Sequence, residues 1–249
     1  MHGTVVVTAS SGTFPGLLEA LRALPVAVEE CPLVTFAPPP DWSPVDSALE
    51  RWGEFEAIAL TSPRAARAFA ARMSERKVPA AASSGPQVWA GGAATATALG
   101  GRLGPAQVPS DSAVGEFGSA GALARTMLAA GVIGPVLFPC GDLRRDELPA
   151  RLRDHGVEVE EVVCYRSVLA AEAEARAAAE RAQVLVVASP SVADLLARAC
   201  PPGVRPALLA VGPTTAAAAL ACGWPPAAVA SRPSTEALTG GVRSLLTAR

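Results

Sequence analysis

Residues 136–165 read VLFPCGDLRRDELPARLRDHGVEVEEVVCY, and residues 5–34 read VVVTASSGTFPGLLEALRALPVAVEECPLV. The two stretches match without a gap when residue 5 is aligned with residue 136. In each, short apolar runs flank an amphipathic stretch, a pattern that predicts strand, helix, strand. Repeats on this scale indicate duplicated structural units. The coinciding pairs are Val5/Val136, Leu17/Leu148, Leu21/Leu152, Arg22/Arg153, Val26/Val157, Val28/Val159, Glu29/Glu160 and Glu30/Glu161.

A second pair of segments is also repeated. Residues 58–63 (IALTSP) resemble residues 185–190 (LVVASP), and residues 91–96 (GGAATA) resemble residues 211–216 (VGPTTA). Short apolar strands that alternate with longer helices predict parallel sheets with helices on both faces. Each complete unit would hold five strands, the number in a flavodoxin-like fold. The sequence leaves open whether the first segment pairs with the second or with the fourth.

Two segments are suited to connect such units. Residues 37–47 (APPPDWSPVDS) are rich in proline, which predicts an extended crossing from one unit to the other. Residues 167–171 are the matching return point.

Composition narrows the class of protein. The 249 residues are 50% hydrophobic and 18% charged, as expected of a globular protein. The formal net charge of −2 and the lack of any basic run argue against nucleic acid or an anionic membrane surface as a partner. The chain begins in a strand without signal-peptide features and has no membrane-spanning apolar stretch, so we expect it in the cytoplasm. Its five cysteines lie far apart without a Cys-x-x-Cys, and its two histidines are distant, so neither a metal site nor a disulfide framework is expected.

Several strands are predicted to end at helix starts that suit an anion. In open parallel sheets, ligands bind beyond the carboxyl ends of the strands, where the unpaired N–H groups of helix N-termini also gather. Serine followed by proline is a typical helix start, and glycine lets a ligand approach the backbone. Ordinary helix capping explains any one of these features. Their repetition in both halves suggests two equivalent anion-binding sites that face a shared cleft and bind one large ligand. The features are Ser62-Pro63, Ser189-Pro190, Gly92 with Thr95, Gly212 with Thr215, and Gly141-Asp142 before a helix expected to carry Arg144 and Arg145.

Other catalytic motifs are absent from the sequence. There is no Gly-x-Gly-x-x-Gly after the first strand and no Gly-Lys-Ser/Thr, which argues against dinucleotide and P-loop nucleotide binding. No histidine is placed for a catalytic triad. The only tyrosine, Tyr165, occupies the position that Val34 has in the first copy. A tyrosine that ends a strand often serves only packing, but this one lies where the chain returns between units.

Taken together, Thr61-Ser62-Pro63, Ala188-Ser189-Pro190, the two Gly-x-x-Thr-Ala segments and residues 137–166 resemble the uroporphyrinogen-III synthase family along almost the whole chain. The resemblance implies two flavodoxin-like, doubly wound domains joined by a two-stranded linker. The discontinuous domain would comprise residues 1–35 plus 168–249, and residues 36–167 would form the inserted domain. The family is a cyclising hydro-lyase of heme biosynthesis that needs no cofactor or metal and is usually monomeric.

The resemblance also implies a reaction. The substrate would be hydroxymethylbilane, an acidic linear tetrapyrrole, which loses its hydroxyl to give an azafulvene. Ring D then attacks through a spiro intermediate and is inverted, giving uroporphyrinogen III. The tyrosine of the family motif maps onto Tyr165, whose phenol would protonate or hydrogen-bond the departing hydroxyl. Expected substrate contacts, mostly through backbone N–H groups, are Ser62, Pro63, Arg64, Ala65, Gly92, Ala94, Thr95, Gly141, Arg144, Ser189, Ser191, Gly212, Thr214 and Thr215.

Two other functions compete with this one. A non-catalytic two-domain protein that binds a small anion would share the fold and the helix starts. A regulator fused to an output module would need a DNA-binding domain, for which no residues are left. The ratio of type III to type I uroporphyrin formed from hydroxymethylbilane separates these possibilities.

Overall fold

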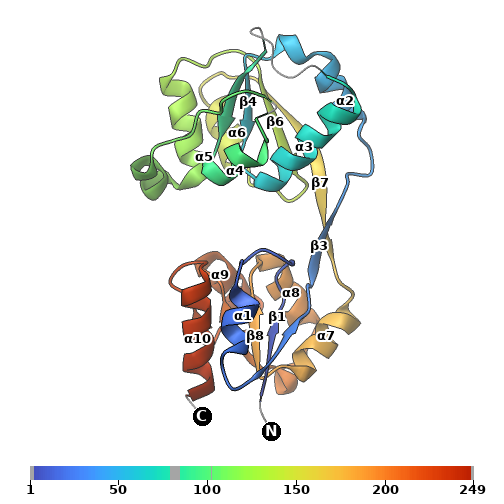
Figure 1. The fold of residues 1–249 in the computed structure, drawn as a ribbon, viewed down its shortest axis with the longest axis vertical. Helices are drawn as coiled ribbons and strands as arrows, with labels where there is room; N and C mark the ends of the chain where they lie inside the picture. Colours follow the sequence, from blue (N-terminus) through green and yellow to red (C-terminus); the bar gives the residue numbers. More distant parts are fainter. Residues whose placement is uncertain (1–2, 79–84, 102, 248–249) are drawn as a thin grey trace. The chain divides into compact units, whose positions relative to one another are not determined.

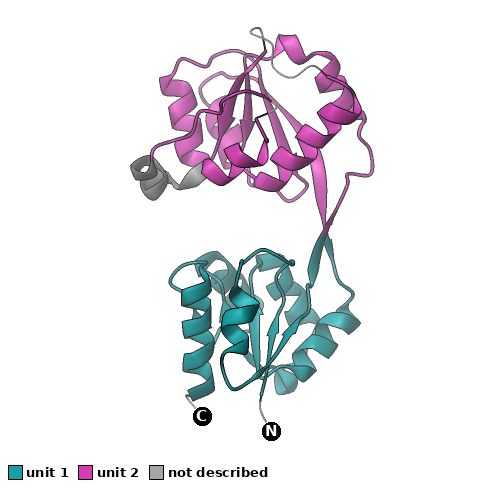
Figure 2. Ribbon diagram, in the orientation of Figure 1, with its two compact units in different colours: residues 1–35, 168–249 teal, residues 36–167 magenta. Residues whose placement is uncertain are grey.

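The computed structural model describes residues 3–78, 85–101 and 103–247, with the side chains of all of these except 111–119. The chain divides into two compact units, unit 1 (Met1–Thr35 and Val168–Arg249) and unit 2 (Phe36–Ser167), which are coloured separately in Figure 2. Each unit contains a five-stranded sheet with helices on both faces, and the strand pairs whose register is defined all run parallel. The predicted α/β class with two parallel sheets is therefore confirmed.

Unit 1 has the strand order β10-β9-β8-β1-β2. Counted along the chain this order is 2-1-3-4-5, the flavodoxin-like arrangement. One face of the sheet packs on α1 and α10 through Leu17, Leu21, Leu238 and Val242, which are fully or almost fully buried. The elements are β1 (Thr4–Val7), α1 (Leu17–Arg22), β2 (Ala27–Glu30), α7 (Glu172–Arg181), β8 (Val184–Val187), α8 (Pro190–Ala199), η2 (Pro202–Val204), β9 (Ala207–Ala210), α9 (Pro213–Ala221), β10 (Ala228–Val229) and α10 (Thr235–Thr247) (Figure 1).

The second sheet has the strand order β3-β7-β6-β4-β5 and lies in unit 2, except that β3 and β7 cross the boundaries between the units. A bridge between Trp89 and Gln107 extends the sheet beyond β5. The elements are β3 (Val34–Ala37), α2 (Ser43–Glu50), η1 (Trp52–Glu54), β4 (Ala57–Leu60), α3 (Pro63–Glu75), β5 (Gln87–Ala90), α4 (Ala93–Ala98), α5 (Asp111–Ala129), β6 (Val136–Gly141), α6 (Glu147–Arg153) and β7 (Val159–Leu169).

The pairing of the repeats, which the sequence left open, is resolved by the sheets. Strand β1 lies beside β8, and β6 lies beside β4. The first segment therefore pairs with the fourth and the third with the second. The order β7-β6-β4-β5 in unit 2 repeats β2-β1-β8-β9 in unit 1.

Strand β4 explains how the core of unit 2 forms. All four of its residues are buried, as expected for a central parallel strand covered on both faces. Side chains alternate between faces along a strand. Ile58 and Leu60 accordingly pack with α2 and α3, whereas Ala57 and Ala59 pack with α5 and α6.

The linker differs between the two copies of the first repeat. In the first copy β2 ends at Glu30 and β3 begins at Val34, whereas in the second β7 continues for 11 residues. Pro32 lies in the break and its aligned residue is Val163. Proline has no N–H to donate to a sheet, so the first copy is interrupted where the second is continuous.

The expectation of an extended crossing was wrong for part of residues 37–47. Residues 43–50 form helix α2, with Pro44 in its first turn and the Ser43 N–H bonded to the Asp41 carboxylate at 2.8 Å. Proline is tolerated in a first helical turn because the amide it lacks would be unpaired there. Only the stretch before this turn is non-helical.

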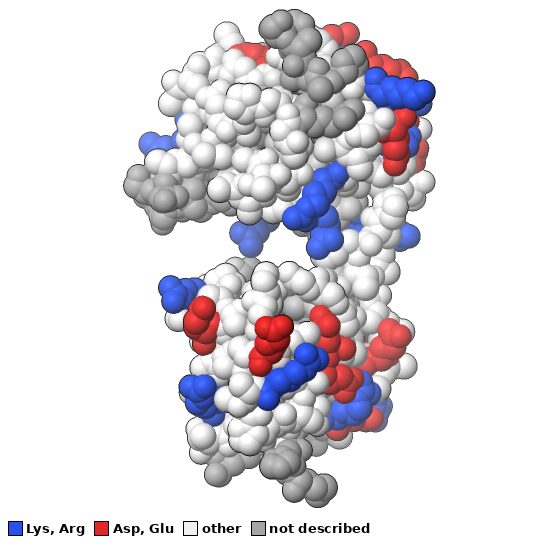
Figure 3. Space-filling view, in the orientation of Figure 1, with Lys and Arg blue, Asp and Glu red and all other residues white. Residues whose placement is uncertain are grey.

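Charges and thiols complete the description. On the visible face of unit 1, acidic and basic side chains are interspersed (Figure 3). The five cysteines are free thiols. No helix within the described ranges combines the length and the hydropathy that crossing a membrane requires.

Candidate active site

A cavity of ≈ 340 Å³ lies at the carboxyl ends of the strands of unit 2. Its walls come from the residues after β4, from the end of β6 and from β7. Strands β4 and β6 are the neighbours at which the chain order of the sheet reverses, the place where open α/β sheets bind ligands. The residues that line the cavity are Thr61, Ser62, Ala120, Phe138, Cys140, Gly141, Arg144, Arg145, Glu147, Leu148 and Tyr165.

The phenol of Tyr165 lies directly against Gly141. The two residues are register partners of β7 and β6, next to an irregularity between Cys140 and Gly141. A β-carbon at position 141 would lie 2.4 Å from Cζ of Tyr165 and 2.6 Å from its hydroxyl oxygen. With the phenol in this position there is no space for a side chain at residue 141, so a larger residue there would have to displace the ring.

Phe36 and Arg64 surround the other side of the tyrosine. The Phe36 and Tyr165 rings meet edge to face with their centroids 5.7 Å apart. The guanidinium carbon of Arg64 lies 3.3 Å from the Phe36 centroid and 5.8 Å from that of Tyr165. Burial lowers the pKa of Arg64, and its interaction with Tyr165 opposes that change. The Tyr165 ring is thus held between an aromatic ring, a guanidinium and a glycine.

Helix α3 begins at this cavity with a capped N-terminus. The Ser62 hydroxyl accepts hydrogen bonds from the backbone N–H groups of Arg64 at 3.2 Å and Ala65 at 3.4 Å. Two of the amides expected to face a ligand are therefore already bonded within the protein.

The equivalent start of α8 in unit 1 is different. Ser189 occupies the N-cap but makes no side-chain cap bond, because its hydroxyl lies 2.7 Å from that of Ser191. The first amides of α8 consequently lack a side-chain acceptor. The same sequence motif thus gives two different electrostatic environments.

Helices α4 and α9 begin alike in the two units. Gly92 and Gly212 are their N-caps, without side-chain cap bonds, and space is open where a β-carbon would lie. Thr95 and Thr215 are buried one turn on, whereas Ala94 and Thr214 are exposed. Both starts leave room for a ligand to approach the backbone.

Arg144 and Arg145 lie in the loop before α6, so the expectation that a helix carries them was wrong. The Asp142 carboxylate shapes this loop by accepting hydrogen bonds from the backbone N–H groups of Leu143 and Ser167, each at 2.9 Å. α6 then begins only at Glu147.

The side chain of Arg144 is already engaged. It forms an ion pair with Glu161, which also bonds Arg153 at 2.8 Å. Burial opposes the ionisation of Glu161, but the hydrogen bonds from the two arginines outweigh it and lower its pKa. A substrate carboxylate would therefore compete with Glu161 for Arg144.

Cys140 lines the cavity but is not equipped as a nucleophile. Burial raises the pKa of its thiol to about 12. The thiolate is the reactive form of cysteine, so at neutral pH this side chain contributes an apolar wall.

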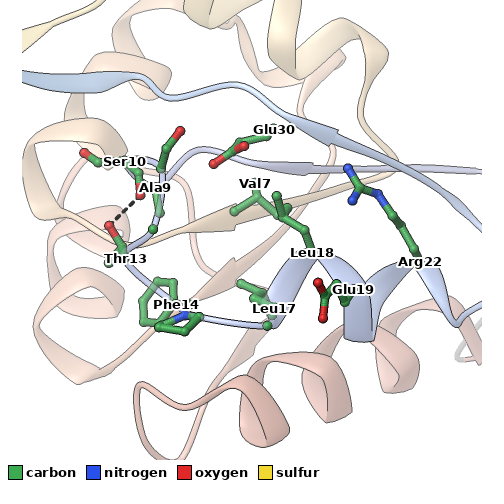
Figure 4. Close-up of a pocket in the computed structure, with 14 residues that line it drawn as sticks. Val7, Ala9, Ser10, Thr13, Phe14, Leu17, Leu18, Glu19, Arg22 and Glu30 are labelled. Atoms are coloured by element: carbon green, nitrogen blue, oxygen red, sulfur yellow. Dashed lines mark hydrogen bonds between the residues drawn. The ribbon is translucent and has the colours of Figure 1, made fainter.

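Unit 1 has its own cavity, of ≈ 270 Å³, which the sequence analysis did not single out. It surrounds the loop of residues 9–16 after β1, where Thr13 donates a hydrogen bond to the Ser10 carbonyl (Figure 4). Glu19, Arg22 and Glu30 lie around the same cavity. The repeat alignment carried a usable signal, because it places Ser10 on Gly141.

The expected site residues separate into three groups. Ser62, Gly141, Arg144 and Tyr165 line the cavity of unit 2 together. Arg64 lines an adjoining cavity that shares Tyr165. The remaining residues lie at helix starts outside these cavities: Pro63, Ala65, Gly92, Ala94, Thr95, Ser189, Ser191, Gly212, Thr214 and Thr215.

Comparisons with known proteins agree with this architecture. The family model described as Uroporphyrinogen-III synthase HemD matches residues 16–240. A mutant uroporphyrinogen III synthase from the extremely thermophilic bacterium Thermus thermophilus is similar in structure, with a TM-score of 0.65 and 16% identity over 99% of this chain and 100% of its own. The uroporphyrinogen-III synthetase of Helicobacter pylori has a TM-score of 0.63 and 18% identity, with both chains covered completely. No curated protein sequence matches the chain. Because the family model covers most of its length, the chain belongs to the uroporphyrinogen-III synthase family, the cyclising synthases of tetrapyrrole biosynthesis.

Proposed function

We propose that unit 2 binds the reacting end of hydroxymethylbilane in the cavity at the carboxyl ends of β4 and β6, with the phenol of Tyr165 as the catalytic acid. The observation that carries this proposal is the fit of that phenol over Gly141. Tyr165 is the one tyrosine of the chain and it lines the cavity. Gly141, against which the phenol lies, has no side chain that would displace it. A phenol has a pKa of about 10 in water and is protonated at neutral pH.

The proposed chemistry balances without an added reagent. The phenol donates its proton to the hydroxyl of the substrate, which leaves as water. The pyrrole that carried this hydroxyl loses its N–H proton as the azafulvene forms, so one proton becomes available to restore the phenol. Ring D attacks the azafulvene carbon to form the spiro intermediate, which fragments and closes again with ring D inverted. The remaining task is orientation, which can supply much of a rate enhancement.

Backbone amides at the strand ends are proposed to hold the substrate carboxylates. A hydrogen bond to a charged group contributes about 1.5 to 3 kcal/mol, and a helix dipole adds about 0.3 to 1 kcal/mol. The open starts at Gly92 and Gly212 and the uncapped start at Ser189 leave amides for this purpose. The Ser62 hydroxyl, together with Pro63 and Ala65 of the same turn, would instead orient the cavity wall. The proposed contacts further include Arg64, Ala94, Thr95, Gly141, Arg144, Ser191, Thr214 and Thr215.

The proposed enzyme is a cytoplasmic monomer that acts without metal or cofactor. Its domains would be the two compact units, residues 1–35 plus 168–249 and residues 36–167. The molar mass of the purified chain in solution, measured by light scattering with and without substrate, tests whether it is a monomer.

The decisive assay uses the product isomers. Purified protein is incubated with freshly prepared hydroxymethylbilane, the products are oxidised, and type III and type I uroporphyrins are separated. Without catalysis the substrate closes to the type I isomer, so we expect type III in excess. Type I alone, from a protein that a separate titration shows to bind hydroxymethylbilane, would indicate a binding protein.

Tyr165→Phe tests the acid directly. We expect turnover to fall about tenfold or more, because general acid catalysis contributes roughly 10² to 10⁴ in rate. The melting temperature should stay close to that of the wild type, because phenylalanine keeps the ring contact with Phe36. Near-normal turnover in this variant would remove Tyr165 from the mechanism.

A further inference from the structure

A second cavity of unit 2 adjoins the proposed active site at Tyr165. Its volume is ≈ 270 Å³, and it lies between the first residues of the unit and helix α3. Phe36, Trp42, Ala68 and Cys164 supply apolar walls, and Arg64 lines it beside Tyr165. Tyr165 lines both cavities, so whatever fills the second one contacts the proposed catalytic side chain.

Arg64 brings an uncompensated positive charge to this apolar wall. None of the carboxylates in the described part of the chain forms an ion pair with it. Its guanidinium is stacked on Phe36, with the guanidinium carbon 3.3 Å from the ring centroid. Such stacking holds a cation in place but leaves the edge of its planar N–H fork available to an anion. Arg64 is half-buried, and this partial burial lowers its pKa. Partial desolvation without a counter-ion disfavours the charge, so the site favours a ligand that supplies an anion.

The other charged groups of the cavity are already paired. Arg72 bonds both oxygens of Asp46, at 2.7 and 2.6 Å, and lies 2.9 Å from Glu75. Its guanidinium carbon is also 5.1 Å from the Trp42 ring centroid. The ligand preference of the cavity is therefore set by Arg64 and by the aromatic walls.

We propose that this cavity binds a small aromatic carboxylate, with the carboxylate on the Arg64 guanidinium and the ring against Phe36 and Trp42. The volume is close to the lower limit of about 300 Å³ for ordinary ligand pockets, which restricts the occupant to about one ring. Occupancy would restrain Tyr165 and engage Arg64, a proposed substrate contact, and so reduce turnover. Binding is independent of the proposed reaction, whereas this inhibition rests on it.

The test uses benzoate as the probe and benzamide as its uncharged analogue. Each is titrated into the full-length, isotopically labelled protein without substrate, and the amide resonances are followed by NMR. We expect benzoate to shift the resonances of residues 36–42 and 64–68, with an affinity about tenfold or more above that of benzamide, since a charge-assisted hydrogen bond is lost with the charge. Arg64→Gln should abolish this preference. Arg67→Gln removes an exposed charge of the same helix that does not line the cavity but repels Arg64. It should retain the preference within about twofold, because an exposed charge is screened by water and salt.

Three outcomes would overturn the proposal. They are equal affinities for benzoate and benzamide, an unchanged preference in Arg64→Gln, and benzoate shifts confined to residues 61–62 and 141–148 around the first cavity. Retained amide dispersion in Arg64→Gln shows that the variant is folded. Benzoate inhibition of the isomer assay is measured separately, so binding without inhibition would count against the proposed roles of Tyr165 and Arg64 in the reaction and not against the site.

Discussion

The two units are copies of one scaffold that differ where Tyr165 lies. Residues 91–100 and 211–220 have the same sequence of buried and exposed positions, and Leu21 and Leu152 are both fully buried in aligned helices. At one aligned position, however, unit 1 has Ser10, in the loop after β1, and unit 2 has Gly141, the last residue of β6. The Ser10 hydroxyl donates a 2.7 Å hydrogen bond to the carbonyl of Val34, the residue aligned with Tyr165.

This difference supports the proposal that the reaction takes place in unit 2. In unit 1 a small residue at position 34 leaves room for a serine side chain, which bonds the neighbouring strand. In unit 2 the phenol of Tyr165 takes that room, and position 141 has no side chain. The aligned core residues are alike in both copies. The two contacting residues differ together: Ser10 with Val34 in one copy, and Gly141 with Tyr165 in the other. Under the proposed function, unit 2 would be the reacting unit and unit 1 a supporting one.

Gly141→Ala should give the largest effect, because it makes unit 2 more like unit 1. The new methyl group would lie 2.4 Å from Cζ of Tyr165 and would displace the ring. We expect turnover to fall about tenfold or more and stability to fall by about 1 to 3 kcal/mol, the usual cost of overpacking. Turnover is measured by the isomer assay and stability by urea unfolding.

A double substitution tests whether the phenol is the cause. In a Tyr165→Val background, which reproduces Val34 of unit 1, Gly141→Ala should be nearly neutral in stability because the space is free. Residues in contact give non-additive effects of this kind. An equal loss of stability in both backgrounds would mean that Gly141 is needed for its backbone and not for the room it leaves.

Much of the fold could be predicted from the sequence, because the spacing of apolar residues marks the strands and helices of each repeat. Strands such as β4 and β8 are buried on both faces, and their continuous apolar runs are visible without a structure. Which segments share a sheet depends on contacts between distant parts of the chain, and no local pattern encodes that choice. Helix α2 was missed because the prolines around it outweighed Ser43-Pro44 as a helix start.

The candidate site was less predictable because it depends on side-chain rotamers. Ser62-Pro63 and Ser189-Pro190 look equivalent in sequence. The hydroxyl of Ser189, however, is hydrogen-bonded to that of Ser191, whereas the position equivalent to Ser191 in the other motif is Arg64. The stacking of Arg64 on Phe36 joins residues far apart in the chain. The loop around Ser10 was overlooked because its residues have no charge, although its alignment with Gly141 indicated it.

The two serine caps offer an intermediate test of the comparison. Ser62→Ala removes an oxygen that accepts two N–H bonds, and loss of such a cap costs about 1 kcal/mol. Hydrogen exchange in the first turn of α3 should therefore accelerate about fivefold if it proceeds by local opening. Ser189→Ala removes no cap bond and should leave exchange in α8 nearly unchanged. Equal acceleration in the two helices would show that the caps are equivalent in solution.

The smallest expected effect concerns the ion pair that joins α2 to α3 in unit 2 and its counterpart that joins α7 to α8 in unit 1. In unit 2, Arg72 of α3 bonds both oxygens of Asp46 of α2, and the side chains are only 20% and 18% exposed. In unit 1, Arg198 of α8 lies 3.4 Å from Glu172 of α7, with 52% and 60% exposure. Exposed pairs contribute little to stability because water and salt screen them. Asp46→Asn should therefore lower the melting temperature at neutral pH more than Glu172→Gln does.

The pH dependence of this difference identifies its cause. The hydrogen bond from Arg72 holds the pKa of Asp46 below its ordinary value. A carboxylate whose pKa is lower in the folded state stabilises the protein above its unfolded pKa of about 3.9, and this contribution is lost as the pH falls through the folded pKa. The difference in melting temperature between the wild type and Asp46→Asn should accordingly be full at pH 7 and shrink in acid. A difference that persists after Asp46 is protonated would come from packing of the side chain, and the two units would then differ in shape and not in charge at this position.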